Sequence, residues 1–125
     1  MKSVFVSYKH EDKKQKDIVE KWAKEGRFGD NVVVTGESKD VRHHGGKAIK
    51  NHLSPKLRGA STVVVLVGDD THNSSGVAYE VQHAKSQNKK IITVRIPDTK
   101  GGNPASLKDS DLVAFEPNAI KKAIE

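Results

Sequence analysis

Several residue types and patterns are scarce or missing from this sequence of 125 residues. There is no cysteine, so disulfide bonds and thiolate chemistry are excluded. Aromatic residues make up only 5%, which leaves few side chains that could stack on bases and disfavours a nucleic-acid ligand. No apolar stretch approaches the roughly 20 residues that span a bilayer, and the opening segment 1–8 is too short for a signal peptide. We therefore expect a cytoplasmic protein that does not enter a membrane.

Positive charge is in excess, but it is unevenly distributed. The formal net charge is +6. Residues 1–58 contain 14 Lys or Arg against 8 Asp or Glu, whereas residues 59–125 contain 8 of each. Such a field attracts an anionic small molecule, an acidic protein or nucleic acid, and it also favours solubility. Because acids alternate with the basic residues, as in the segment 9–14, charge alone does not select among these ligands.

Strand-like and helix-like patterns alternate along the chain. Short runs rich in β-branched residues predict strands at 4–8, 32–35, 63–67, 90–96 and 112–115. Helical spacing of apolar residues predicts helices from about residue 10 to residue 26, from 48 to 57 with a break at Pro55, over 77–84 and over 118–125. The alternation predicts one α/β domain over residues 1–125, with three layers and a flavodoxin-like, five-stranded parallel sheet.

The segment 60–83 contains the best single candidate for a functional residue. Its apolar run 63–67 is typical of a central strand covered on both faces. In the helix predicted after it, Glu80 lies about 70° from the centre of the apolar stripe, on the shoulder of the buried face. Open α/β sheets bind ligands at the edge where this helix begins. The alternative is that Glu80 only complements the helix macrodipole.

Two other loops are expected at the same sheet edge and could form a polar cleft with Glu80. They are the segment 7–12 after the first strand and the segment 35–46 after the second. Ser7 and Asp12 could contact a ligand there, or could only finish a strand and cap a helix. Tyr79 could contact a ligand or pack against a neighbouring helix, and Trp22 is expected in the core.

Several kinds of site find little support in the sequence. No glycine-rich phosphate loop follows the first strand, so neither a dinucleotide fingerprint nor a P-loop is indicated. A receiver-like switch could use Asp69 or Asp70 as its phosphorylated residue, but the segment 7–10 lacks the acids needed to hold magnesium. The neighbouring His43 and His44 make a poor metal pair without further ligands. We expect no structural metal and no bound cofactor.

Two segments carry a resemblance to a known family. The segment VFVSYKHED at 4–12 resembles the first box of TIR domains, and STVVVLVGDDTHNSSGVAYEVQHAKSQNKKIITVRI at 61–96 resembles the following part of that fold. The similarity is greatest to the bacterial TIR-like branch related to the Thoeris antiphage sensor proteins. The residues of this chain that match features of that branch are Gly68, Thr71, Ser75, Val77 and Glu80. The resemblance covers nearly the whole chain and is strongest over residues 44–96.

This resemblance implies cleavage of the nicotinamide–ribose bond of NAD, either by hydrolysis or by formation of a cyclic ADP-ribose signal. NAD or a related nucleotide would then be the substrate, in prokaryotic defence or signalling. Glu80 would be the catalytic carboxylate, since it can stabilise an oxocarbenium-like state. The residues expected to contact the substrate are Phe5, Ser7, Tyr8, Lys9, His10, Asp12, Ser38 and Tyr79.

One departure from the family pattern keeps a second hypothesis open. The family usually has Trp directly before Val77, where this chain has Gly76. The loop 39–44 is also basic, where related enzymes commonly have an aromatic or acidic residue. The alternative is a non-catalytic TIR-like interaction module, which acts through self-association or by docking a TIR or effector partner.

Overall fold

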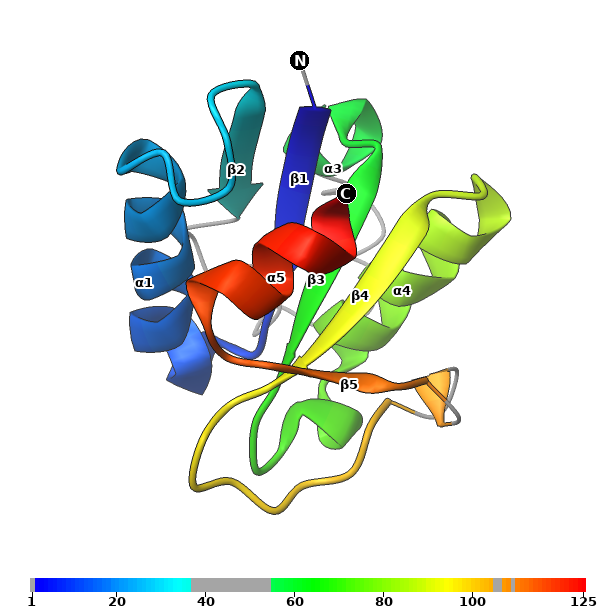
Figure 1. Ribbon diagram of the computed structural model, residues 1–125. Coiled ribbons are helices and arrows are strands. Elements are labelled where there is room, and N and C mark those ends of the chain that lie inside the picture. The colour runs from blue at the N-terminus through cyan, green and yellow to red at the C-terminus, as the bar shows by residue number, and fades with distance from the viewer. Residues whose placement is uncertain (1, 37–54, 105–106, 109) are drawn as a thin grey trace.

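A computed structural model describes residues 2–36, 55–104, 107–108 and 110–125. All the predicted strands are present: β1 (Lys2–Ser7), β2 (Val32–Gly36), β3 (Thr62–Val67), β4 (Lys90–Arg95) and β5 (Leu112–Ala114). They form one parallel sheet in the order β2-β1-β3-β4-β5 (Figure 1). The fold prediction is therefore confirmed, because this is the doubly wound order of flavodoxin-like proteins.

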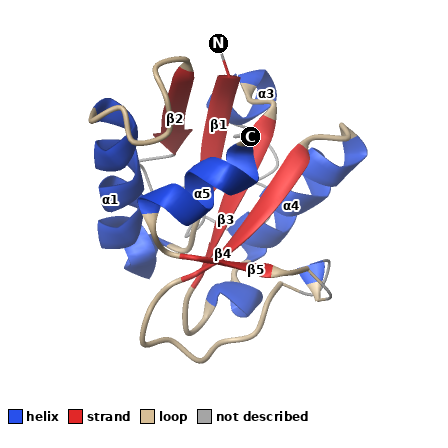
Figure 2. Ribbon diagram, viewed as in Figure 1, coloured by secondary structure: helices blue, strands red, loops and turns tan. Residues whose placement is uncertain are grey.

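Helices cover both faces of the sheet. The longer ones are α1 (Lys13–Lys24), α4 (Ser75–Ser86) and α5 (Pro117–Ile124), and the shorter ones are α3 (Pro55–Gly59) and the 3₁₀ turns η1 (His10–Asp12) and η3 (Thr71–Asn73). In Figure 2, α5 lies in front of the strands and α4 behind them. The predicted restart at Pro55 is the beginning of α3, and residues 48–54 lie outside the described part. Within the described residues, no helix is long and apolar enough to cross a membrane.

Two apolar clusters fill the space between the sheet and its helices. Side chains of β3 contribute to both, because Val64 and Leu66 pack on the α1 and α5 side while Val63, Val65 and Val67 pack on the α3 and α4 side. All six residues of β3 are buried, as expected for a central strand of a parallel sheet. The expectation that Trp22 belongs to the core is also confirmed, because it packs on the first cluster, 5.0 Å between ring centres from Phe115.

The alternation of side chains along β1 decides which of its residues can reach α4. Val4, Val6 and Tyr8 belong to the cluster under α1 and α5, whereas Phe5 belongs to the cluster under α3 and α4. Successive residues of a strand face opposite sides of the sheet. Ser7 therefore faces α4 from the carboxyl end of β1.

Candidate functional site

Ser7 and Glu80 meet at the carboxyl edge of the sheet. The hydroxyl of Ser7 donates a hydrogen bond of 2.7 Å to Oε1 of Glu80. Ser7 is completely buried and Glu80 is half-buried on the second turn of α4. Because an ionised carboxylate can only accept, the hydroxyl must be the donor. The end of β1 thus holds one oxygen of the carboxylate in place, which goes beyond a simple interaction with the helix dipole.

The beginning of α4 is built so that Glu80 lies at the margin of the buried face. Ser74 caps the helix, since its hydroxyl accepts a hydrogen bond of 3.2 Å from the backbone nitrogen of Val77. The residues that α4 buries against the sheet are Gly76, Val77, Val81 and Ala84. Glu80 lies beside this apolar stripe, at the margin of the buried face, as the sequence predicted.

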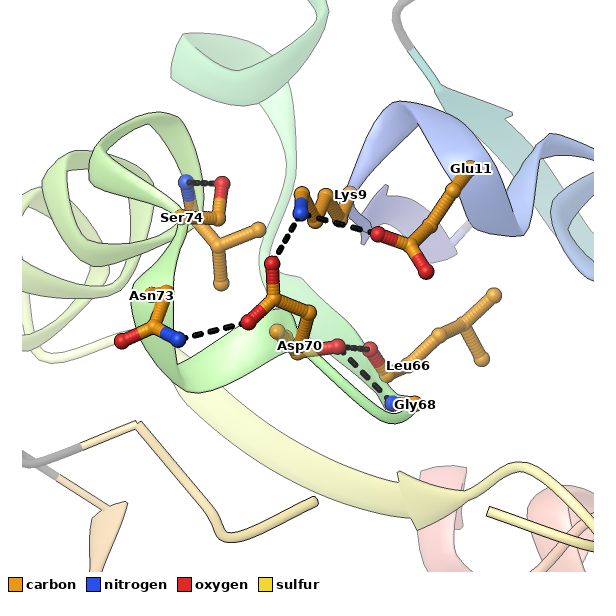
Figure 3. A network of polar contacts seen from close by, with 9 residues as sticks. Lys9, Glu11, Leu66, Gly68, Asp70, Asn73 and Ser74 are labelled. Atoms are coloured by element: carbon orange, nitrogen blue, oxygen red, sulfur yellow. Dashed lines mark hydrogen bonds and ion pairs between the residues drawn. The ribbon is translucent and has the colours of Figure 1, made fainter. Parts of the chain in front are cut away.

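The turn between β3 and α4 is closed by the hydroxyl of Thr71. This buried group accepts a hydrogen bond of 2.8 Å from the nitrogen of Gly68 and donates one of 3.2 Å to the carbonyl oxygen of Leu66. Figure 3 shows both contacts at the end of β3. Strand pairing of β3 ends at Val67, and the hydroxyl of Thr71 supplies hydrogen bonds to the backbone on either side of that end. These hydrogen bonds order the turn that leads to α4 and Glu80.

Lys9 joins the loop after β1 to the turn after β3. Its ammonium group forms an ion pair with Asp70 and a second one, 2.8 Å long, with Glu11 (Figure 3). The side-chain amide of Asn73 donates a hydrogen bond of 2.5 Å to the other carboxylate oxygen of Asp70. The hydrogen bond to Asp70, followed by that to Glu11, raises the pKa of Lys9, and the bond from Lys9 lowers the pKa of Asp70. Lys9 is therefore charged, and a phosphate group would have to compete with two carboxylates for it.

Asp12 is a buried carboxyl group with an unsatisfied oxygen. Only 7% of the residue is exposed, and among the described residues its Oδ2 has no hydrogen-bond partner. Burial raises the pKa of Asp12 from its ordinary value of 3.8 to about 6, helped by the charges of Glu11 and Asp69 and opposed by Lys9 and Thr71. Asp12 occupies the N-cap position of α1, as the alternative expected, but its side chain makes no capping hydrogen bond.

The remaining predicted contact residues are spread over different parts of the molecule. Tyr8 is buried on the side of the sheet away from α4, where the Nζ of Lys16 lies 5.9 Å from its ring centre. Phe5 is a core residue on the α4 side. His10 is exposed in η1 and Tyr79 is half-buried in α4. Ser38 lies outside the described residues, and ligand contact by any of these side chains stays a prediction.

Sequence reasoning missed how the loop after β4 supports the site. The backbone nitrogen of Lys100 donates a hydrogen bond of 2.9 Å to Oδ1 of Asp69. Gly101 packs so closely that a Cβ there would overlap the carbonyl oxygens of Gly68 and Asp69. The pair Gly101-Gly102 was visible in the sequence as a loop signal, but nothing near it indicated its partner.

The geometry does not favour the receiver-like alternative. Asp70 is paired with Lys9, and Asp69 accepts from the backbone of Lys100. In the part of the chain that the structure describes, no group of three or more histidine or acidic residues is arranged to hold a metal ion. A receiver site would need such a cluster beside its phosphorylated aspartate.

Comparison with known proteins identifies the family of this chain. The model of the family described as "Thoeris protein ThsB, TIR-like domain" matches residues 5–101. The chain belongs to this family. The match to the ThsB TIR-like family includes both Ser7 and Glu80, together with the turn between β3 and α4.

A solved structure agrees on the fold. The crystal structure of the TIR domain of the Toll-related receptor TRR-2 from Hydra magnipapillata is similar with a TM-score of 0.66 and 14% identity, over 100% of each chain. At this identity the likeness concerns the fold alone. No curated protein matches the chain.

Proposed function

We propose that this TIR-like domain cleaves the bond between nicotinamide and ribose in NAD, as part of prokaryotic defence or signalling. The observation that supports this most is the contact between Ser7 and Glu80, because it presents a half-buried carboxylate at the ligand-binding edge of the sheet.

The chemistry needs little more than a well-placed carboxylate. The bond between C1′ of the ribose and the ring nitrogen breaks, and its electron pair leaves with neutral nicotinamide, so no strong general acid is needed. Glu80 faces the oxocarbenium-like centre and stabilises its positive charge. A water oxygen then bonds to C1′ and releases a proton, giving ADP-ribose; in a cyclisation, an atom of the same molecule takes the place of water.

Lys9 is the side chain best suited to the pyrophosphate. It lies on the loop that directly follows Ser7, and its charge complements phosphate oxygens. Because Asp70 and Glu11 already hold it, binding requires the phosphate to replace at least one of them. This exchange gives the site a means of selecting a strongly anionic ligand over a neutral nucleoside.

The direct test is turnover of NAD by purified protein over a wide range of concentrations, with and without a crowding agent, because TIR enzymes commonly depend on self-assembly. The products are resolved by chromatography, which also separates ADP-ribose from cyclic forms. We expect nicotinamide release by the wild type and its loss in Glu80→Gln. Release that persists in Glu80→Gln would contradict the assignment of this carboxylate.

Gly76 favours a second candidate, a non-catalytic interaction module. It is buried in the first turn of α4, where the resemblance leads one to expect Trp, and the missing aromatic side chain alters the surroundings of Glu80. Under this alternative, neither wild type nor Glu80→Gln releases nicotinamide at any concentration, while sedimentation shows that both self-associate equally.

A further inference from the structure

The carboxyl group of Asp12 occupies the space that a side chain at Gly68 would need. A Cβ atom built on Gly68 would lie 2.6 Å from Oδ2 and 2.9 Å from Oδ1 of Asp12. The carboxyl group therefore lies directly against the first residue after β3, and a larger residue there would have to displace it. Two segments that are far apart in the sequence meet at this point, η1 with the beginning of α1, and the turn 68–71.

The groups around Asp12 make its negative charge costly. On its own loop, Glu11 is a second negative charge and Lys9 is a positive one. Across the contact, Asp69 is negative, whereas hydrogen bonding from Thr71 favours the ionised form and lowers the pKa of Asp12. Lys9 cannot fully compensate Asp12, because it is already paired with Asp70 and Glu11. On α1 the next cation, Lys13, is paired with Asp17.

The protonated, neutral form of the Asp12 carboxyl group is the form that this environment favours. Burial removes hydration from the carboxylate, and its Oδ2 has no hydrogen-bond partner among the described residues, so the ionised form is destabilised relative to the neutral acid. Hydrogen bonding from Thr71 offsets only part of this cost. This agrees with the pKa of about 6 that burial and the neighbouring acids produce. At that value the group changes charge under mildly acidic conditions, which an ordinary aspartate does not do.

We propose that Asp12 is a proton-operated clasp between the loop after β1 and the turn after β3. The protonated carboxyl group lets the turn at Gly68 pack against it. When the proton leaves to water, the carboxylate favours local opening of the contact, because opening lets it regain hydration and move away from Asp69. The ion pair of Lys9 with Asp70 joins the same two segments and opposes their wider separation. The turn continues directly into the helix that carries Glu80.

The test is the pH dependence of amide hydrogen exchange in the whole chain, read as protection factors so that the intrinsic exchange rate cancels. The reporters are the backbone amides of Gly68, Asn73 and Ser74, which are hydrogen-bonded within the turn. Between pH 4 and pH 7 their protection should fall by about fiftyfold, as linkage requires for a group with a pKa of about 6 when closed and 3.8 when open. In Asp12→Asn the protection should stay high and flat.

Two further variants complete the design. Asp111→Asn changes an exposed aspartate beside β5 and should behave as wild type. Asp69→Asn removes one of the charges that destabilise ionised Asp12, so the midpoint of the pH dependence should move to lower pH. Carbon-13 NMR of the Asp12 carboxyl group in wild type gives its titration directly, whether or not Asp12→Asn folds.

Two results would overturn the clasp. One is a titration of Asp12 near the ordinary value of 3.8. The other is an unchanged loss of protection between pH 4 and pH 7 in Asp12→Asn. Neither readout uses NAD, so the clasp and the proposed enzymatic activity stand or fall independently.

Discussion

The hydroxyl of Ser7 donates to Oε1 of Glu80 across a separation of 73 residues in the sequence. This hydrogen bond joins the last residue of β1 to the second turn of α4. It restricts the rotamers that the Glu80 side chain can adopt, because one of its oxygens is held by the end of β1. The sequence left Ser7 as either a ligand contact or a strand end, and the hydrogen bond leads us to predict that Ser7 positions Glu80.

For Ser7→Ala we expect nicotinamide release to fall by about one to two orders of magnitude, mainly in kcat, because the variant loses orientation of Glu80 rather than substrate contacts. The loss of one hydrogen bond should lower the free energy of unfolding by only about 1 kcal/mol. Steady-state kinetics and urea unfolding measure the two effects. Ser3→Ala, on the same strand and the same face, is the control, and an equal loss of kcat there would contradict the positioning role.

Asp12 makes a distinct contribution to stability. Its pKa is higher in the folded state, at about 6, than the ordinary 3.8, so the folded protein binds the extra proton. Stability should therefore be greatest below pH 4 as far as this group is concerned, and be lost as the pH rises toward 6. At pH 7, Asp12→Asn should be more stable than wild type by roughly 1–3 kcal/mol. Urea unfolding at both pH values measures this, and a variant less stable than wild type at pH 7 would refute it.

The ion pair of Lys9 with Asp70 should control affinity for anionic ligands. In Asp70→Asn, Lys9 loses one of its two competing carboxylates, and we expect ADP-ribose to bind several-fold more tightly, while Lys9→Met should weaken binding. Isothermal calorimetry at low and high salt measures both, and the gain should shrink with salt because exposed charges are screened. Asp30→Asn, which replaces an exposed aspartate just before β2, is the control. Weaker binding by Asp70→Asn would show that Asp70 itself contacts the ligand.

Gly101 and Gly102 form a matched pair for testing the support behind the site. A Cβ at Gly101 would lie 2.6 Å from the carbonyl carbon of Asp69, whereas one at Gly102 would meet nothing within 4 Å. We expect Gly101→Ala to lower the free energy of unfolding by about 1–3 kcal/mol, through displacement of the loop after β4. Gly102→Ala should be close to neutral. Thermal unfolding of the two variants side by side decides the point, and equal melting temperatures would mean that the loop adapts without cost.

Much of the fold could be predicted because it depends on local patterns. The unbroken run Val63–Val67 indicated a strand buried on both faces, and the positions of Val77, Val81 and Ala84 indicated the face of α4 that packs on the sheet. The placement of Glu80 on the margin of that face followed from the same spacing. Element ends were less accurate: β1 ends at Ser7 and not at Tyr8, because pairing with neighbouring strands sets the end of a strand.

The partners of the polar residues could not be predicted in the same way. Ser7 and Tyr8 were both expected to contact the substrate, and only the assembled sheet shows that Ser7 faces α4 while Tyr8 is buried on the opposite side. Lys9 suggested a phosphate contact, yet the turn after β3 brings Asp70 to it. Asp12 suggested a helix cap, yet the close approach of Gly68 buries it without a capping bond.

The sequence by itself determined the order of the elements, the parallel sheet and the helix that carries Glu80, because hydrophobic periodicity acts over a few neighbouring residues. Only the tertiary structure decided the contact of Ser7 with Glu80, the pairing of Lys9 and the burial of Asp12. Each of these depends on loops that are distant in the chain and meet only where adjacent parallel strands end. Charge, hydration and hydrogen bonding at such a meeting point are properties of the assembled sheet edge.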